Sequence, residues 1–166
     1  ARHREYGGSV YLLEPHVKEG EGGLRDLHTA LWMARIKFKA KRLREIVHKG
    51  VVPESELAAV FESRDFLWKV RNTLHFLNGG HQDQLTFEYQ ERVAATCGYR
   101  DADERRAVER FLQDYYLHAA RVKRFADLVI ERCMEQPRRF GRIFSRRIRA
   151  GVRIVGGAPS SLDYLI

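Results

Sequence analysis

The segment from Val108 to Cys133 carries the most regular apolar pattern in the chain. Apolar side chains recur there every three or four positions, at Val108, Phe111, Leu112, Tyr115, Ala119, Val122, Ala126, Val129, Ile130 and Cys133. An α-helix has about 3.6 residues per turn, so this spacing gathers them on one helical face. The pattern predicts a long amphipathic helix that ends near Glu135, before Pro137. Asp101 or Asp103 is expected to cap its start, and Phe111, Tyr115 and Tyr116 are expected in the core.

Shorter patterns predict the remaining elements. Helical spacing of apolar residues indicates helices over residues 24–38, 42–48, 54–77 and 88–97. A β-like run over residues 9–14, stopped by Pro15, is the only strand-like feature, and residues 82–86 form a polar linker. These elements predict an all-α fold, an antiparallel helical bundle with a short β-like segment near the N-terminus.

Composition excludes some classes of protein. No apolar run approaches the roughly 18 residues of a membrane span, and the charged N-terminus does not resemble a signal peptide. The chain lacks an initiator Met, so we expect an excised domain or a processed product. Cys97 and Cys133 lack metal-ligand spacing and are expected to be buried free thiols of a cytoplasmic protein.

The net charge of +8 is concentrated in two clusters. One lies within residues 37–44 and the other within residues 138–153. Each is either a solvated basic face, or an interdomain surface, or a site for an anionic partner. We divide the chain into an N-terminal strand and glycine loop (1–23), a helical bundle (24–136) and a basic C-terminal tail or linker (137–166), which we expect to be poorly ordered or loosely packed.

Residues 18–26, Lys-Glu-Gly-Glu-Gly-Gly-Leu-Arg-Asp, place a glycine loop directly before a predicted helix. Backbone N–H groups at such a helix start, flanked by Lys18 and Arg25, can form a cradle for an anion. The alternative is a tight loop in which glycine only supplies a positive φ. Asp26 has several possible roles: it can fix Arg25, cap the helix or pair with Arg71.

A second candidate set lies on the predicted helix over residues 54–77. Arg71 and His75 are four residues apart and face the same way, and Arg64 lies two turns before Arg71. These side chains either pair with bundle neighbours or line a binding cleft. The neighbours that could satisfy them are Asp65, Asp83 and Asp114.

Three segments resemble a known family in order along the chain. They are residues 14–27 around the glycine loop, residues 71–77 (Arg-Asn-Thr-Leu-His-Phe-Leu) with 82–87 and 90–94, and residues 108–116 (Val-Glu-Arg-Phe-Leu-Gln-Asp-Tyr-Tyr). Together they resemble the helical domain that follows the nucleotidyltransferase core of bacterial PII uridylyltransferase/uridylyl-removing enzymes. The resemblance covers roughly residues 1–135. His16 and Glu21 depart from the Asn and Pro that are frequent in the family.

The resemblance implies a helical accessory domain of an enzyme that uridylylates and deuridylylates the PII nitrogen-signalling protein. The parent enzyme would use UTP and Mg²⁺ in the cytoplasm. Its partners would be its own catalytic core, its phosphohydrolase domain and PII, and neither a membrane nor nucleic acid is among them. The implied nucleotide-binding residues are Lys18, Gly20, Gly22, Gly23, Arg25, Asp26, Arg71 and His75.

Neither catalytic centre of such an enzyme is found in this sequence. The nucleotidyltransferase superfamily carries a Gly-Ser motif followed by Asp-x-Asp, and Asp101-Ala102-Asp103 lacks the preceding Gly-Ser, so helix capping explains it better. The phosphohydrolase chemistry requires a His-Asp pair, which is absent, and the seven histidines lack ligand spacing. We therefore expect this segment alone to be inactive, with no catalytic residue, no metal ligand and no bound cofactor.

Two other functions remain open from the sequence. One is a helical domain of another nucleotidyltransferase, such as a glutamine synthetase adenylyltransferase, although the segments at residues 71–77 and 82–87 favour the uridylyltransferase. The other is a basic helical module that binds nucleic acid or an acidic protein. Steep salt dependence of nucleic-acid binding would identify the basic module.

Overall fold

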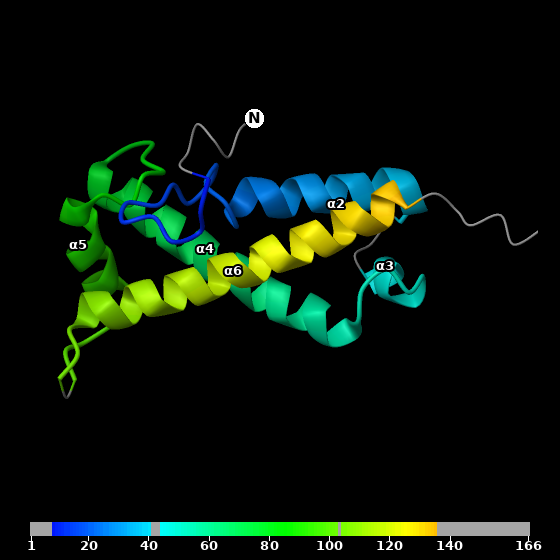
Figure 1. Ribbon diagram of the computed structural model, residues 1–166. Coiled ribbons are helices and arrows are strands. Elements are labelled where there is room, and N and C mark those ends of the chain that lie inside the picture. The colour runs from blue at the N-terminus through cyan, green and yellow to red at the C-terminus, as the bar shows by residue number, and fades with distance from the viewer. Residues whose placement is uncertain (1–7, 41–43, 103, 136–166) are drawn as a thin grey trace, which may run out of the picture. The chain divides into compact units, whose positions relative to one another are not determined.

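Figure 1 shows a computed structural model of the chain, which describes residues 8–40, 44–102 and 104–135. Within these residues the fold is all-α, as predicted, and α6 has its most extensive contacts with α2 and α4. The helices are α2 (Leu24–Phe38), α3 (Arg44–His48), α4 (Glu54–Asn78), α5 (Phe87–Cys97) and α6 (Ala107–Met134). The expected tail, residues 137–166, lies outside the described residues.

The predicted helix boundaries hold to within one residue or so wherever the structure describes them. Gly79 and Gly98 follow α4 and α5 with φ of 68° and 97°. This left-handed conformation ends helices, and glycine adopts it without a steric penalty. The first residues of the helix expected over 42–48 lie outside the described part of the chain, and α3 begins at Arg44.

The three long helices do not all alternate in direction. Helix α4 is antiparallel to α6, because Ser63 lies against His118 while Glu56, earlier in α4, lies against Arg124, later in α6. Helices α2 and α6 run in the same direction along each other (Figure 1). The loop before α2 packs on Ala119, halfway along α6, so both helices then extend toward their C-terminal ends together.

The core lies between α2, α4 and α6 and follows the predicted apolar faces. Phe111 and Phe125 are fully buried, Tyr115 is buried beside Phe111, and Tyr116 is half-buried. Burial raises the pKa of Tyr115. The aromatic residues predicted for the core are therefore core residues. Cys133 is buried as expected, but Cys97 is only partly buried, and both thiols are free.

Residues 9–14 do not form the β-like strand that their composition suggested. Their carbonyl groups are bound by side chains from the helices: Tyr116 donates to the Leu12 carbonyl (2.8 Å) and Gln90 donates to the Leu13 carbonyl (2.7 Å). Because side chains already occupy these carbonyl groups, a neighbouring strand is not needed to satisfy them. An isolated antiparallel β-bridge instead joins His16, which follows this segment, to Gln84.

Asp101 binds the start of α6, although it does not occupy the capping position itself. Arg106 precedes the helix, and the Asp101 carboxylate accepts the N–H of Ala107 at 2.7 Å. Asp103, the alternative, lies outside the described residues. Among the described helices, none is long and apolar enough to cross a membrane.

Candidate functional site

The glycine loop is closed by its own hydrogen bonds. The N–H groups of Gly20, Gly22 and Gly23 donate to the His16 carbonyl (2.8 Å), the Asp26 carboxylate (2.8 Å) and the Gly20 carbonyl (3.0 Å). The first N–H groups of α2, those of Leu24 and Arg25, donate to the carbonyl groups of Val17 and Lys18. These donors are therefore occupied, and the geometry favours the tight-loop interpretation over the backbone anion cradle.

The three glycines are required by close backbone packing. A Cβ atom on Gly22 would lie 2.1 Å from the Ala119 carbonyl oxygen of α6, and Gly22 also has a φ of +71°. Added Cβ atoms on Gly20 and Gly23 would lie 2.7 Å and 2.8 Å from backbone oxygens of the loop itself. Contacts this short do not occur between real Cβ atoms and backbone oxygens, so side chains are excluded at these positions. The loop is therefore packed tightly against α6.

Asp26 and Arg25 have separate partners. Asp26 is buried and its carboxylate accepts the Gly22 N–H, which fixes the loop to the first turn of α2. The guanidinium of Arg25 binds Glu19, with N–O distances of 2.8 Å and 3.1 Å. The side-chain hydrogen bond and charge of Glu19 raise the pKa of Arg25. Arg25 therefore pairs with Glu19 instead of Asp26, and the Asp26 carboxylate holds the glycine loop through the Gly22 N–H.

Lys18 and Arg25 are the exposed cations of this loop. The side chains of Lys18 and Arg25 are 38% and 47% exposed, and the Lys18 ammonium lies 3.9 Å from Glu19. Glu19 was not singled out from the sequence, although it stands between Lys18 and the glycines and is a natural partner for both cations.

Arg71 and His75 point to Asp83, one of the bundle neighbours expected for them. Arg71 Nε lies 2.6 Å and His75 Nε2 lies 3.1 Å from the Asp83 carboxylate. Burial acts to raise the pKa of Asp83, but the hydrogen bonds from Arg71 and His75 outweigh it and hold that pKa below its usual value. The Asp83 carbonyl also accepts the Val17 N–H at 2.8 Å. Arg71 is thereby connected to the glycine loop through Asp83 rather than through Asp26.

The pKa of His28 is affected by residues of both candidate sets. Burial lowers the pKa of His28, and the charges of Arg25 and Arg71 lower it further. Both guanidinium groups therefore act on the same ring, which lies beside Trp68. Arg64 does not share the Asp83 carboxylate with Arg71 and His75; it pairs with Asp65, another of the expected neighbours, at 2.7 Å.

The structure brings together most of the candidate residues but gives them different surroundings. The loop residues lie together at the start of α2, and Arg71 and His75 are joined to that loop through Asp83. Lys18 and Arg25 are exposed, whereas Asp26 is buried. Arg71 and His75 are partly buried. In the described ranges, no group of three or more His, Cys, Asp or Glu side chains is placed to hold a metal ion. Lys18 and Arg25 are the candidate residues whose charged groups are most exposed.

The fold and the loop define an all-α domain that presents a cationic loop on a packed helical scaffold. The chain belongs to the GlnD PII-uridylyltransferase family, whose sequence model matches residues 1–130.

Relatives with curated descriptions agree with this assignment. A bifunctional uridylyltransferase/uridylyl-removing enzyme of Ectopseudomonas mendocina (strain ymp) is 46% identical over 129 residues, which are 78% of this chain and 14% of that enzyme. Enzymes of the same description from Pseudomonas putida (strain W619) and Pseudomonas aeruginosa (strain LESB58) are 43% and 44% identical, over 79% and 78% of the chain and 15% and 14% of their own lengths. The chain thus spans about one seventh of these relatives. No solved structure matches it significantly.

Proposed function

We propose that this chain is a helical accessory domain that helps form the nucleotide cleft of a PII uridylyltransferase/uridylyl-removing enzyme. Membership of the family and the bifunctional description of the relatives support this function. The observation that carries the proposal is the placement of Lys18 and Arg25, exposed cations on a loop that is fixed to α6 at Ala119 and to α4 through Asp83.

The side chains of this loop, rather than its backbone, are the groups that meet the nucleotide. Arg25 uses its Nε and one terminal nitrogen on Glu19, and a guanidinium has five N–H donors. Its remaining N–H donors can contact a phosphate while Glu19 holds the guanidinium in place. Lys18 adds a second charge beside it. Because the loop is already ordered, binding does not have to restrict its backbone, which favours preorganised contacts.

The reacting groups lie outside this chain in the proposal. The described residues do not supply a cluster for Mg²⁺, so the catalytic core of the same polypeptide would hold both the metal and the attacking hydroxyl. Arg71 and His75 position the segment around Asp83 and thereby support the loop. The partners are then that core, the phosphohydrolase domain and PII, in the cytoplasm.

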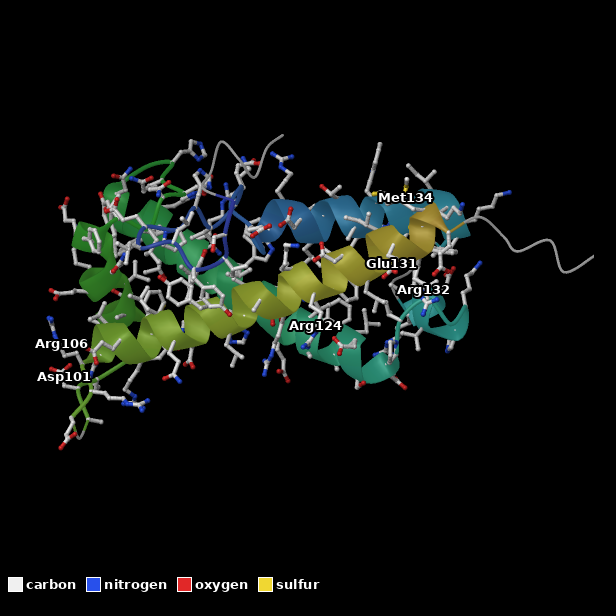
Figure 2. The ribbon with its side chains drawn as sticks, in the orientation of Figure 1. Asp101, Arg106, Arg124, Glu131, Arg132 and Met134 are labelled. Atoms are coloured by element: carbon white, nitrogen blue, oxygen red, sulfur yellow. The ribbon has the colours of Figure 1, made fainter. Side chains whose placement is uncertain are left out.

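A titration of the chain with nucleotides tests the proposal. Mg-UTP, Mg-ATP and a random oligonucleotide are added at low and high salt, and the thermal midpoint and the heat of binding are measured. Because the catalytic core supplies the rest of the cleft, we expect Mg-UTP to bind this chain weakly and to raise the midpoint only at high nucleotide concentration, and the Lys18→Ala/Arg25→Ala double variant to lose that effect. The matched control is Arg124→Ala/Arg132→Ala, which removes two exposed cations from α6 (Figure 2) and should retain it.

Two results would contradict the proposal. The first is a thermal midpoint that no nucleotide changes. The second is a UTP response that the loop variant retains, because the loop cations would then have no part in binding. Oligonucleotide binding that weakens steeply with salt would instead identify the basic-module function.

A further inference from the structure

A groove of about 860 Å³ lies beside α4 and α5, and the proposed function does not use it. Small-molecule sites have volumes of roughly 300–1,000 Å³. Lys18 and Arg25 are not among the residues that line the groove. The side chains that matter here are Arg64, Trp68, Lys69, Asn72 and Phe76 of α4 and Thr96 of α5.

The groove has two aromatic walls with different surroundings. Trp68 is half-buried, with the Arg71 guanidinium 5.3 Å from its ring centre and the His28 ring centre 6.3 Å away. These contacts hold the indole in place. Phe76 is 81% exposed, one of the most exposed large apolar side chains among the described residues. A planar ring that stacks on Phe76 would remove this apolar surface from water.

One face of α4 combines that ring with polar groups. Lys69, Asn72 and Phe76 are three and four residues apart, so they follow one another along the same side of the helix. The Lys69 ammonium donates to the Cys97 carbonyl at 3.0 Å, which holds it beside the groove. Arg64 contributes less charge, since Asp65, which also lines the groove, pairs with it at 2.7 Å.

We propose that this groove binds a small planar heterocycle that carries a phosphate, a chemistry represented by nucleoside monophosphates. The ring stacks on Phe76 beside Trp68, the phosphate contacts Lys69, and the edge of the ring hydrogen-bonds to the Asn72 amide, which has both donors and an acceptor. The site is separate from the loop that carries Lys18 and Arg25.

The fluorescence of Trp68 provides a direct test. The chain has two tryptophans, so a Trp32→Phe variant leaves Trp68 as the single reporter. Because Trp32 is largely exposed, we expect this change to leave the fold intact. UMP and AMP are titrated into this variant. We expect a saturable change in Trp68 fluorescence. Uridine, which lacks the phosphate, and ribose 5-phosphate, which lacks the base, should each bind about tenfold more weakly.

Two pairs of variants, each made in the Trp32→Phe background, locate the site. Phe76→Ala should weaken binding about tenfold, because the stacking surface is lost, whereas Phe87→Ala, which also removes an exposed phenylalanine, should not. Lys69→Ala should likewise weaken binding. Its control is Lys49→Ala, since Lys49 also donates to a backbone carbonyl, that of Phe38, but lies outside the groove. Circular dichroism checks that all variants remain folded.

The proposal is overturned if neither nucleotide gives a saturable signal up to about 10 mM, a limit that corresponds to negligible affinity. It is also overturned if the signal survives both Phe76→Ala and Lys69→Ala. A signal that only Lys18→Ala/Arg25→Ala abolishes would belong to the loop, which would refute the groove site and support the proposed function.

Discussion

Replacement of Gly22 by alanine is the most informative change to the glycine loop. The alanine Cβ would lie 2.1 Å from the Ala119 carbonyl oxygen, and the residue would have to keep a φ of +71°. A left-handed conformation costs a non-glycine residue about 1–2 kcal/mol. Displacing a packed backbone costs about 1–3 kcal/mol more. We therefore expect Gly22→Ala to lower the free energy of unfolding by about 2–5 kcal/mol.

A Gly79→Ala variant separates the cost of the left-handed conformation from the cost of the contact with α6. The φ of Gly79 is +68°, nearly the same as that of Gly22, but a Cβ added to it would meet nothing within 4 Å. Gly79→Ala should therefore cost only the conformational part, about 1–2 kcal/mol. The difference between the two variants isolates the contact with α6.

Urea unfolding followed by circular dichroism measures both variants. For a slope of about 1–3 kcal/mol per molar urea, the midpoint of Gly22→Ala should fall clearly below that of Gly79→Ala. Equal midpoints would refute the close packing of the loop on α6, because only the shared backbone conformation would then contribute. A change in slope would require a comparison of the two denatured states before the midpoints are interpreted.

Four further variants test the electrostatics. Asp83→Asn should lower the free energy of unfolding by about 1–3 kcal/mol at neutral pH. The exposed Asp65→Asn should leave it almost unchanged, and urea unfolding measures both. Since the pKa of Asp83 is lowered by its partners, its stabilisation is present above the unfolded value of 3.8 and is lost as pH falls below it, so the variant should lack that loss. Burial lowers the pKa of His118, so the chain should lose stability as pH falls below 6.5, and His118→Asn should reduce this loss in a series of thermal midpoints. Arg25→Ala should leave the urea midpoint nearly unchanged, because an exposed ion pair contributes little to stability.

The helices and much of the core could be predicted from the sequence because their signals are local. The apolar spacing from Val108 to Cys133 and the glycines that follow α4 and α5 depend only on near neighbours in the chain. Asp83 could also be named as a possible partner of Arg71 and His75, because it follows them in the chain after a short connection.

The state of the glycine loop could not be predicted because it depends on distant residues. Whether its N–H groups are available is decided by Asp26 and by carbonyl groups that fold back on them. The requirement for Gly22 comes from Ala119, which lies far along the chain on α6. The common direction of α2 and α6 (Figure 1) could not be predicted either, because helical spacing alone carries no information on the direction of packing.

The most direct test of the central claim is the KM for UTP of a complete enzyme that contains this loop. Residues 1–130, the part matched by the family, can replace the corresponding segment of the Pseudomonas aeruginosa enzyme, which is 44% identical in this region. Loss of charge-assisted phosphate contacts is worth about 1.5–3 kcal/mol each. Loss of two such contacts, about 3 kcal/mol or more together, corresponds to at least about a hundredfold. We therefore predict that Lys18→Ala/Arg25→Ala raises the KM for UTP about a hundredfold or more, while Arg106→Ala/Arg124→Ala, which removes two exposed cations of the exchanged segment, leaves it unchanged. An active exchanged enzyme whose KM for UTP is the same with and without the loop cations would contradict the account.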